Sequence, residues 1–396
     1  MMEHNLTDKW TKFNRQKIEG RRDARNSGIE LLKVFAIFLI VVSHATQTLA
    51  DTNTYISYQD YVINLSLATT DLQQLIATMF RYSGMLGNVI FFVCSAWFLL
   101  DSKRSNKRKI LQILADIWVI SVGIFIIVFF QRNGQMDGKM ILEQFLPTIC
   151  MNNWYMTCYF LFCLLYPFLN LVLSRINQRA LLRTCIVLLI MYVVFNYVLN
   201  GLFFFYSRLI LWVTIYFVIA YMKRYLLHSA DSLRINLLLL VAGIGGNIAI
   251  IFVTNFLGLR IVFFEDKLLL WNNMSSPFIL LIAIALLNIA RNTNFRSKLI
   301  NHISGLSYLI YIIHDNMLLR TYYRPMLWEF VYKTFGYEYL LLWILVISLF
   351  VFTFGLCSAF LYEQTIQRVV TRICNYGYPR VAQMWNRFEN RLLRWR

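Results

Sequence analysis

The chain has 396 residues, of which 59% are hydrophobic and 15% are charged. An ordinary soluble domain is about half apolar and a quarter charged, so this composition excludes a soluble enzyme, a DNA-binding protein and a disordered chain. Windows of about 18 or more nearly uncharged residues recur along the sequence, which is the length a helix needs to cross a bilayer. The period-two alternation of outer-membrane barrels is not visible. The sequence therefore predicts an all-α, polytopic helical membrane protein.

Ten membrane spans are predicted from the apolar runs. They lie at about residues 29–50, 80–100, 110–131, 153–173, 181–200, 207–226, 235–256, 276–290, 303–322 and 339–362. No repeat and no long linker divides them. The expected organisation is therefore a basic N-terminal segment at 1–28, one ten-helix membrane domain at 29–362, and a basic tail at 363–396.

The distribution of positive charge predicts the orientation of the chain. With the ten spans in place, 28 lysines and arginines fall on one side of the membrane and 9 on the other. Basic residues collect in cytoplasmic loops, so both termini are expected in the cytoplasm of a plasma-membrane protein. This bias also explains the net charge of +18 without nucleic acid as a partner.

The C-terminal tail is predicted to form an interfacial helix rather than a further span. Its aromatic and apolar residues recur at helical spacing with arginines between them. They are Trp385, Phe388, Leu392 and Trp395, separated by Arg387, Arg391 and Arg394. Such a helix places rings at the headgroup boundary and guanidinium groups toward anionic lipid, so the lipid bilayer is an expected partner.

The first span carries two residues that are costly to bury in a membrane, Lys33 and His44. They are 11 residues apart, which at the helical repeat places them on one face and about 16 Å apart along the axis. Lys33 is expected toward the cytoplasm and His44 toward the outside. The structural alternatives are a lysine that extends to the headgroups and a histidine that bonds a neighbouring helix.

A second polar stripe is predicted on the ninth span. It consists of Ser304, Ser307, Tyr311 and His314, which fall within one sector of a continuous helix. His314 is expected at a depth similar to that of His44, so the two histidines are hypothesised to share one buried site. Asp315 points elsewhere on the helix and is expected to pair with a cation or with a second histidine on a neighbouring helix. A purely structural interhelical bond is the alternative for His314.

The outer end of the fourth span contains amide and aromatic side chains. Asn153, Trp154 and Tyr159 would form a lining suited to sugar hydroxyls, together with Tyr311. Trp and Tyr at the end of a span are more often interfacial anchors.

A short cytoplasmic loop is dense in positive charge, and it includes Arg104, Lys107 and Arg108. Topology alone explains this loop, but clustered Arg and Lys also bind phosphate groups of a cofactor. Among the seven cysteines there is no CxxC pair, and no Cys/His set has metal-ligand spacing, so no metal is expected.

Four segments resemble motifs of the integral-membrane acyltransferase 3 family. Lys33 and His44 fit its Arg/Lys-x10-His pattern within a first span that contains IELLKVFA at 29–36. The other three segments are VIFFVCSAWFL at 89–99, Asn153-Trp154-Tyr155 through Tyr166-Pro167, and ISGLSYLIYIIH at 303–314. Each motif is weak alone, but the four occur in the family's order and cover nearly the whole chain.

The sequence departs from the family pattern at three places. Ala96 replaces the glycine usual after the serine of the second motif. The family's Arg-x-x-Arg element is represented by Arg104 and Lys107, and a lysine cannot form the bidentate contact of an arginine. Near the end of the chain, Glu363 lacks the proline that often follows it in the family.

The resemblance implies an O-acyltransferase that moves an acetyl group from cytoplasmic acetyl-CoA to a hydroxyl of an extracytoplasmic, cell-surface glycan. In that scheme His44 is the base or the acyl carrier, while Lys33 holds a CoA phosphate or polarises the thioester. His314 and Asp315 complete the catalytic set.

Two other classes of function fit parts of the sequence. An exporter of a glycan or of its lipid-linked precursor also needs many spans and a polar midplane. Exporters often show internal repeats and helices broken by Gly or Pro, and few such features are visible here. The third class is a membrane receptor or anchor that catalyses no reaction, and the buried Lys33 and His44 argue against it only weakly.

Overall fold

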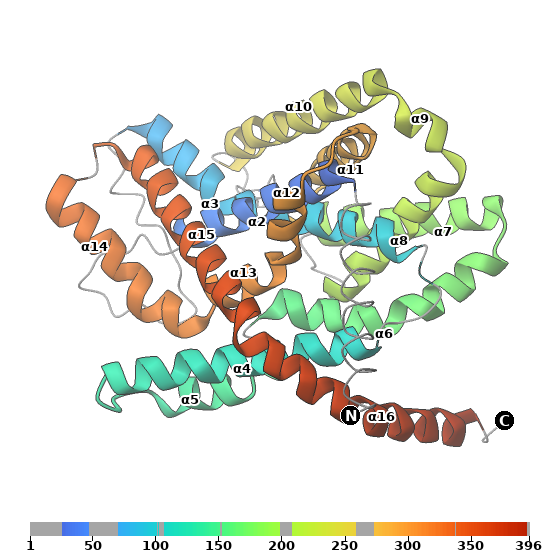
Figure 1. Ribbon diagram of the computed structural model, residues 1–396. Helices are drawn as coiled ribbons and strands as arrows, with labels where there is room; N and C mark the ends of the chain where they lie inside the picture. The colour runs from blue at the N-terminus through green and yellow to red at the C-terminus, as the bar shows by residue number, and fades with distance from the viewer. Residues whose placement is uncertain are drawn as a thin grey trace. The chain divides into compact units, whose positions relative to one another are not determined.

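The structure is a computed structural model that describes residues 26–46, 70–100, 102, 107–150, 153–198, 208–258, 273–336 and 338–393. Every regular element in these residues is a helix, as the sequence predicts (Figure 1). The basic N-terminal segment predicted at 1–28 falls largely outside the described residues, as does Arg104 of the basic loop.

Seven of the described helices are long and apolar enough to cross a membrane. Their membrane-spanning parts coincide with seven of the ten predicted spans. They are α2 (Ser27–Thr46), α3 (Asp71–Leu99, apolar from Leu75), α4 (Lys107–Gln131), α6 (Trp154–Arg175), α7 (Gln178–Ile190) continued by the π-helical segment Met191–Val198, α10 (Leu233–Gly258, apolar to Thr254) and α15 (Leu340–Gln364).

The other helices are shorter or more polar. They are α5 (Gly138–Phe145), α8 (Arg208–Tyr225), α9 (Leu227–Asp231), α11 (Pro277–Asn292), α12 (Lys298–Gly305), α13 (Ser307–His314), the π-helical turn η5 (Leu319–Tyr323), α14 (Arg324–Phe335) and α16 (Ile366–Leu393). The predicted sixth and eighth spans correspond to α8 and α11. The count of ten spans stays a prediction.

The prediction of one continuous ninth span at 303–322 is wrong. The segment consists of α12, α13 and η5, with breaks at Leu306 and after His314. The second break has a local cause, because the Asn316 side chain accepts a hydrogen bond from the backbone N–H of Leu318 at 3.0 Å. Asn side chains that bond the backbone two residues on replace the helical pattern by a turn. The predicted polar stripe is therefore divided between two helices.

The chain separates into two units that interleave along the sequence. The first comprises Met1–Ile40, Tyr82–Phe98 and Asn177–Ser307, and the second comprises Val41–Arg81, Leu99–Ile176 and Tyr308–Arg396. In the first unit α7 packs on α8, and α10 packs on α11. In the second unit α4 contacts α5 and α16, and α15 contacts α16.

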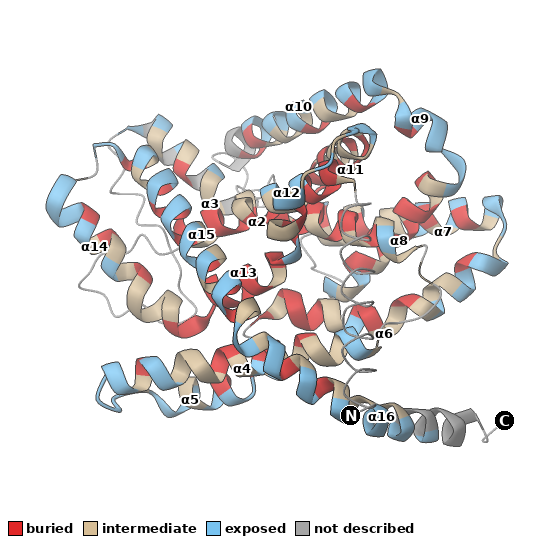
Figure 2. Cartoon of the chain, viewed as in Figure 1, coloured by how far each residue is buried: buried red, intermediate tan, exposed pale blue. Residues whose placement is uncertain are grey.

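The helices differ in how far their residues are buried (Figure 2). Half of the residues of α8 are buried, whereas most described residues of α10 are exposed. Two glycines of the first unit permit close approach of helices. A Cβ at Gly87 would lie 2.6 Å from the backbone oxygen of Ala36, and one at Gly28 would lie 2.1 Å from that of Ala290. Neither position can therefore accept a side chain without moving a helix.

The second unit contains a buried carboxyl group that joins four helices. Asp116 of α4 is fully buried and accepts hydrogen bonds from Gln112, Tyr308, Tyr362 and Gln367 at 2.8–3.0 Å. These donors come from α4, α13, α15 and α16. A buried carboxyl group is tolerated only when its oxygens are bonded in this way.

The tail predicted at 363–396 is helical in its described part, α16. Its side chains at Trp385, Phe388, Arg391 and Leu392 lie outside the described residues. The interfacial role of this helix therefore stays a prediction.

Candidate functional site

His44, His314 and Asp315 lie together in the second unit. Nδ1 of His44 is 3.1 Å from Oδ1 of Asp315 and 3.1 Å from Nε2 of His314. The two imidazole rings are stacked with their centroids 5.3 Å apart. His314 and Asp315 are each only 2% exposed. The site therefore joins the end of α2 to the end of α13, as the hypothesis of one shared site requires.

The hydrogen bonds assign the tautomers of both histidines. Nδ1 of His314 is 2.7 Å from the backbone oxygen of Ile310, so it carries a proton and donates it to that carbonyl. In a neutral ring, Nε2 of His314 is then an acceptor. Nδ1 of His44 faces this acceptor and the Asp315 carboxylate, so it carries the proton between them. The unprotonated nitrogen of His44 is therefore Nε2, which is the arrangement of a general base oriented by a carboxylate.

A cation balances the buried carboxylate. NH1 of Arg320 lies 2.9 Å from Oδ1 of Asp315, the same oxygen that faces His44. Asp315 thus contacts a second histidine on another helix, His44 of α2, and its cation comes from its own segment and not from a neighbouring helix. Arg320 follows Asp315 by five residues, across the break at the end of α13, so the local turn brings it back onto the carboxylate.

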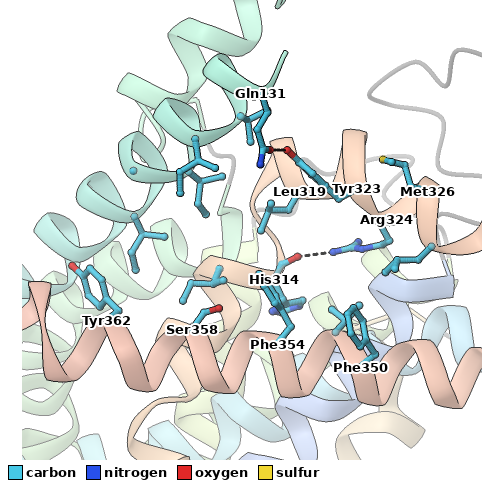
Figure 3. Close-up of a pocket in the computed structure, with 18 of the residues that line it drawn as sticks. Gln131, His314, Leu319, Tyr323, Arg324, Met326, Phe350, Phe354, Ser358 and Tyr362 are labelled. Atoms are coloured by element: carbon cyan, nitrogen blue, oxygen red, sulfur yellow. Dashed lines mark hydrogen bonds between the residues drawn. The ribbon is translucent and has the colours of Figure 1, made fainter. Parts of the chain in front are cut away.

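Arg324 connects the ends of the two helices that carry the histidines. Its NH1 donates to the backbone oxygen of His44 at 2.9 Å. Its NH2 donates to the backbone oxygen of His314 at 2.5 Å (Figure 3). Trp328 adds a hydrogen bond from Nε1 to the backbone oxygen of Ala45 at 3.0 Å. The C-terminal carbonyls of a helix lack intrahelical partners and carry partial negative charge. A planar guanidinium satisfies two such ends at once and fixes the distance between the histidines.

A line of aromatic rings leads from α6 to the histidines. The rings of Trp154 and Tyr155 are 5.6 Å apart, those of Tyr155 and Tyr311 are 5.8 Å apart, and Tyr311 is 5.8 Å from His314. Two predicted lining residues, Trp154 and Tyr311, are thus linked through Tyr155.

The remaining lining candidates are the two polar residues at either side of this line. Asn153 is buried, and its Oδ1 has no hydrogen-bond partner within the described part of the chain. Tyr159 lies one turn beyond Tyr155 on α6, next to Cys163. Asn153 therefore offers an acceptor for a bound hydroxyl, and Tyr159 does not join the line of rings.

Lys33 belongs to a polar cluster of the first unit. Its Nζ lies 3.0 Å from Oε2 of Glu30, and the hydroxyl of Ser304 donates to the same carboxylate. Glu30 is 2% exposed, so the carboxyl group is buried and its bonds hold the ammonium group in one place. The helix α2 is continuous from Ser27 to Thr46, and the predicted helical spacing of Lys33 and His44 is retained.

The described part of the basic loop begins at the start of α4. Lys107 is partly exposed and Arg108 is exposed. Arg104 lies outside the described residues, so its spacing to Lys107 has no structural counterpart here.

Four residues of the site were missed from the sequence, and each has a reason. Arg320 and Arg324 counted only as charges on the outer side, because the broken helix that returns them to Asp315 and to the helix ends was not foreseen. Tyr155 belongs to the group of aromatic residues at the end of the fourth span that were interpreted as interfacial anchors, and Trp328 lies outside every predicted span. The available signal was two arginines within ten residues of His314 and Asp315, of which Arg320 falls inside the predicted ninth span.

The arrangement is suited to proton transfer at a buried position. A neutral histidine backed by a carboxylate accepts a proton from a hydroxyl, and the carboxylate stabilises the imidazolium that forms. Among the described residues, no group of three or more His, Cys, Asp and Glu is placed to hold a metal ion.

Comparison with known proteins agrees with this chemistry. The family model Acyl_transf_3, described as an acyltransferase domain, matches residues 26–362. This range includes His44, His314 and Asp315, and it covers most of the chain. Searches of curated proteins and of solved structures each found no significant match. The chain belongs to the acyltransferase 3 family.

Proposed function

We propose that this membrane acyltransferase transfers an acetyl group from cytoplasmic acetyl-CoA to a hydroxyl of an extracytoplasmic, cell-surface glycan. In this proposal it acts in the plasma membrane, with both termini in the cytoplasm. The observation that carries the proposal is the contact of His44 Nδ1 with the Asp315 carboxylate at 3.1 Å, which places the proton on Nδ1 and makes Nε2 the basic nitrogen of the ring.

In the proposed reaction His44 moves one proton. Nε2 accepts the proton of the glycan hydroxyl, and the oxygen forms a bond to the thioester carbonyl carbon. The C–S bond then breaks, and the departing thiolate takes the proton from Nε2. Asp315 stabilises the transient imidazolium, while burial of the site limits hydrolysis of the thioester. A step through an acyl-histidine uses the same nitrogen and is detected as labelled protein after rapid denaturation near neutral pH, because acid hydrolyses an acyl-imidazole.

The donor is proposed to enter from the cytoplasmic side. Lys33 stands 11 positions before His44 on α2, toward the end that the charge count places in the cytoplasm. Its ammonium group would bind a CoA phosphate or the thioester oxygen, and Arg104, Lys107 and Arg108 would bind the other phosphates.

The acceptor is proposed to bind along the aromatic line. Trp154 and Tyr311 offer ring faces for a sugar, and Asn153 offers its amide oxygen. Tyr159 stays a proposed contact at the edge of this surface.

Export of a glycan is the rival function, and the family match favours transfer over export. The direct test is incubation of purified protein with acetyl-CoA that is radiolabelled in the acetyl group and with glycan isolated from the cell surface. Label in the glycan, lost on mild alkaline treatment, is the expected result. Transport of glycan into vesicles without any transfer of label would support the exporter.

The substitution His314→Gln is expected to keep most activity. The ring of His314 accepts a hydrogen bond from His44, and a glutamine oxygen provides the same acceptor. We expect turnover within about tenfold of the native protein, and a larger loss for His314→Ala, because one hydrogen bond contributes roughly 1 kcal/mol. Turnover measured with radiolabelled acetyl-CoA, with thermal unfolding as a control for folding, distinguishes the cases. If His314→Gln is as inactive as His314→Ala while folding normally, His314 takes part in proton transfer itself.

The substitution Lys33→Ala is expected to raise the KM for acetyl-CoA by about tenfold, because a charge-assisted contact to phosphate is lost. Lys33→Arg should retain most of the affinity. Since Lys33→Ala also removes a partner of the buried Glu30, the double variant Glu30→Gln/Lys33→Ala provides the control: it should fold normally and still bind the donor poorly. Normal donor affinity in the double variant would show that Lys33 serves only the ion pair.

A further inference from the structure

A large apolar groove lies entirely within the second unit and reaches the candidate site. Its volume is about 690 Å³, and residues of α4, α13, α14 and α15 line it. His314 is one of the lining residues (Figure 3). Ligand pockets for small molecules have volumes of roughly 300–1,000 Å³. An acetyl group fills only a small part of such a volume, so transfer of acetyl alone does not explain the groove.

The walls of the groove are hydrocarbon. Branched aliphatic and phenylalanine side chains make up most of the lining, with Ile124, Ile127 and Val351 among them. Ile127 is 59% exposed and Phe350 is 56% exposed, so one side of the groove is open. Because α4 and α15 are both membrane-length helices, this open side faces lipid in a bilayer.

A glycine keeps the groove wide. Gly123 of α4 lines it, and a Cβ at this position would meet no atom within 4 Å. Glycine in the interior of a helix is less favourable than alanine by roughly 0.5–1 kcal/mol. The space beside Gly123 is therefore open to the hydrocarbon chain of a ligand.

One end of the groove is polar, and a positive charge follows it in the chain. Gln131 and Tyr323 line this end, and the Tyr323 hydroxyl donates a hydrogen bond to Gln131. Arg132 follows Gln131 and is not itself a lining residue; its exposed guanidinium lies 4.0 Å from the ring centroid of Tyr322. This end of α4 is the one predicted to face outward, away from the basic loop at the other end of α4. A hydrocarbon slot with a cation at its outer rim is complementary to a lipid phosphate of the outer leaflet.

We propose that the groove holds the hydrocarbon chain of a lipid-phosphate-linked acceptor. The phosphate lies at Arg132, and the glycan attached to it is presented to His314 and His44. This inference rests on the proposed function and deepens it, because it names a membrane-anchored glycan as the substrate class. A long acyl chain on the donor is the other source of hydrocarbon, and it does not account for the cation at the outer rim.

The experiment is photo-crosslinking of the full-length protein in phosphatidylcholine nanodiscs with a diazirine analogue of farnesyl phosphate. Labelled peptides are mapped by mass spectrometry. We expect label on residues 119–131 and 350–358, and we expect Gly123→Trp to lower it at least about tenfold, since the indole fills the slot. The matched control is Gly245→Trp on α10, where a Cβ also meets open space and which is remote from the groove lining in sequence. It should leave the labelling unchanged.

Competition by unlabelled compounds identifies the chemical class of the ligand that binds in the groove. Unlabelled farnesyl phosphate should compete about tenfold better than farnesol, and Arg132→Gln should remove that difference, because a contact to a charged group is lost. Competition by farnesol equal to that by farnesyl phosphate would overturn the proposal, and so would labelling that Gly123→Trp does not alter. Either result would mean that the groove contacts bilayer lipid without specific binding. Competition by palmitoyl-CoA as strong as by farnesyl phosphate would also overturn it, in favour of the donor chain.

Crosslinking requires no turnover, so the two proposals fail separately. Labelling that depends on Gly123 and Arg132, in a protein that transfers no acetyl group, would reject the proposed function and leave the lipid-phosphate site. Transfer of acetyl groups by a protein whose labelling does not depend on Gly123 or Arg132 would support the proposed function and reject the lipid-phosphate site.

Discussion

Replacing His44 by alanine is expected to lower acyl transfer by roughly 10²–10⁴-fold, the contribution that a positioned acid or base commonly makes. His44 presents Nε2 as the base because Asp315 and His314 both face Nδ1 at 3.1 Å. Alanine removes the base and leaves both partners in place. The measurement is single-turnover transfer from radiolabelled acetyl-CoA by purified protein.

The control for this prediction separates chemistry from folding. The exposed His228 of α9 provides a matched substitution, since His228→Ala removes a histidine that is remote in sequence from the site. It should leave transfer unchanged, and both variants should elute as a single species with similar unfolding temperatures. Near-native transfer by a well-folded His44→Ala protein would remove His44 from the reaction.

Replacing Asp315 by asparagine is expected to lower transfer by about 10²-fold or more. An amide of the same shape keeps a hydrogen-bonding group near His44 but loses the negative charge that stabilises the imidazolium. Binding of acetyl-CoA should change much less than turnover, because Asp315 acts when the proton has moved. Separate measurement of kcat and KM for acetyl-CoA shows this difference.

Arg320 contributes to the expected effect of Asp315→Asn, because it is the cation paired with this carboxylate. Asp315→Asn leaves Arg320 without the carboxylate that it contacts at 2.9 Å, so part of the loss is structural. The double variant Asp315→Asn/Arg320→Gln removes both charges. If the carboxylate serves proton transfer, the double variant stays as inactive as Asp315→Asn. Recovery of turnover would show that Asp315 is needed only to balance Arg320.

The sequence predicted the features that depend on composition and helical spacing. Long apolar runs gave the helices, because a membrane imposes a length that is easily counted. The pair Lys33 and His44 was found for a similar reason, since a charged or titratable side chain in an apolar run is conspicuous. The family assignment followed from the order of four short motifs, and the family model confirms it.

The features that depend on local breaks and on distant contacts were not predictable. The run at 303–322 contains only two formally charged residues, Asp315 and Arg320, so its apolar content predicts one span. After His314, the Asn316 side chain accepts a hydrogen bond from the backbone N–H of Leu318, and this bond replaces the helical pattern by a turn. A hydropathy profile contains no information about a hydrogen bond between a side chain and the backbone. The bridging of two helix ends by Arg324 depends on which helices are neighbours, and a single sequence contains no measure of that. Arg320 was missed because its approach to Asp315 follows from the same break.

The four hydrogen bonds around Asp116 bear on the order in which the protein is made. Tyr308, Tyr362 and Gln367 follow Asp116 by between 192 and 251 residues, and only Gln112 lies on the same helix. During synthesis α4 is complete long before α13, α15 and α16 emerge from the ribosome. Until the last helices arrive, Gln112 is the donor that α4 itself supplies, and a carboxyl group with so few hydrogen bonds is costly in hydrocarbon. We therefore expect α4 to become fully stable in the bilayer only when the C-terminal helices supply the other three donors.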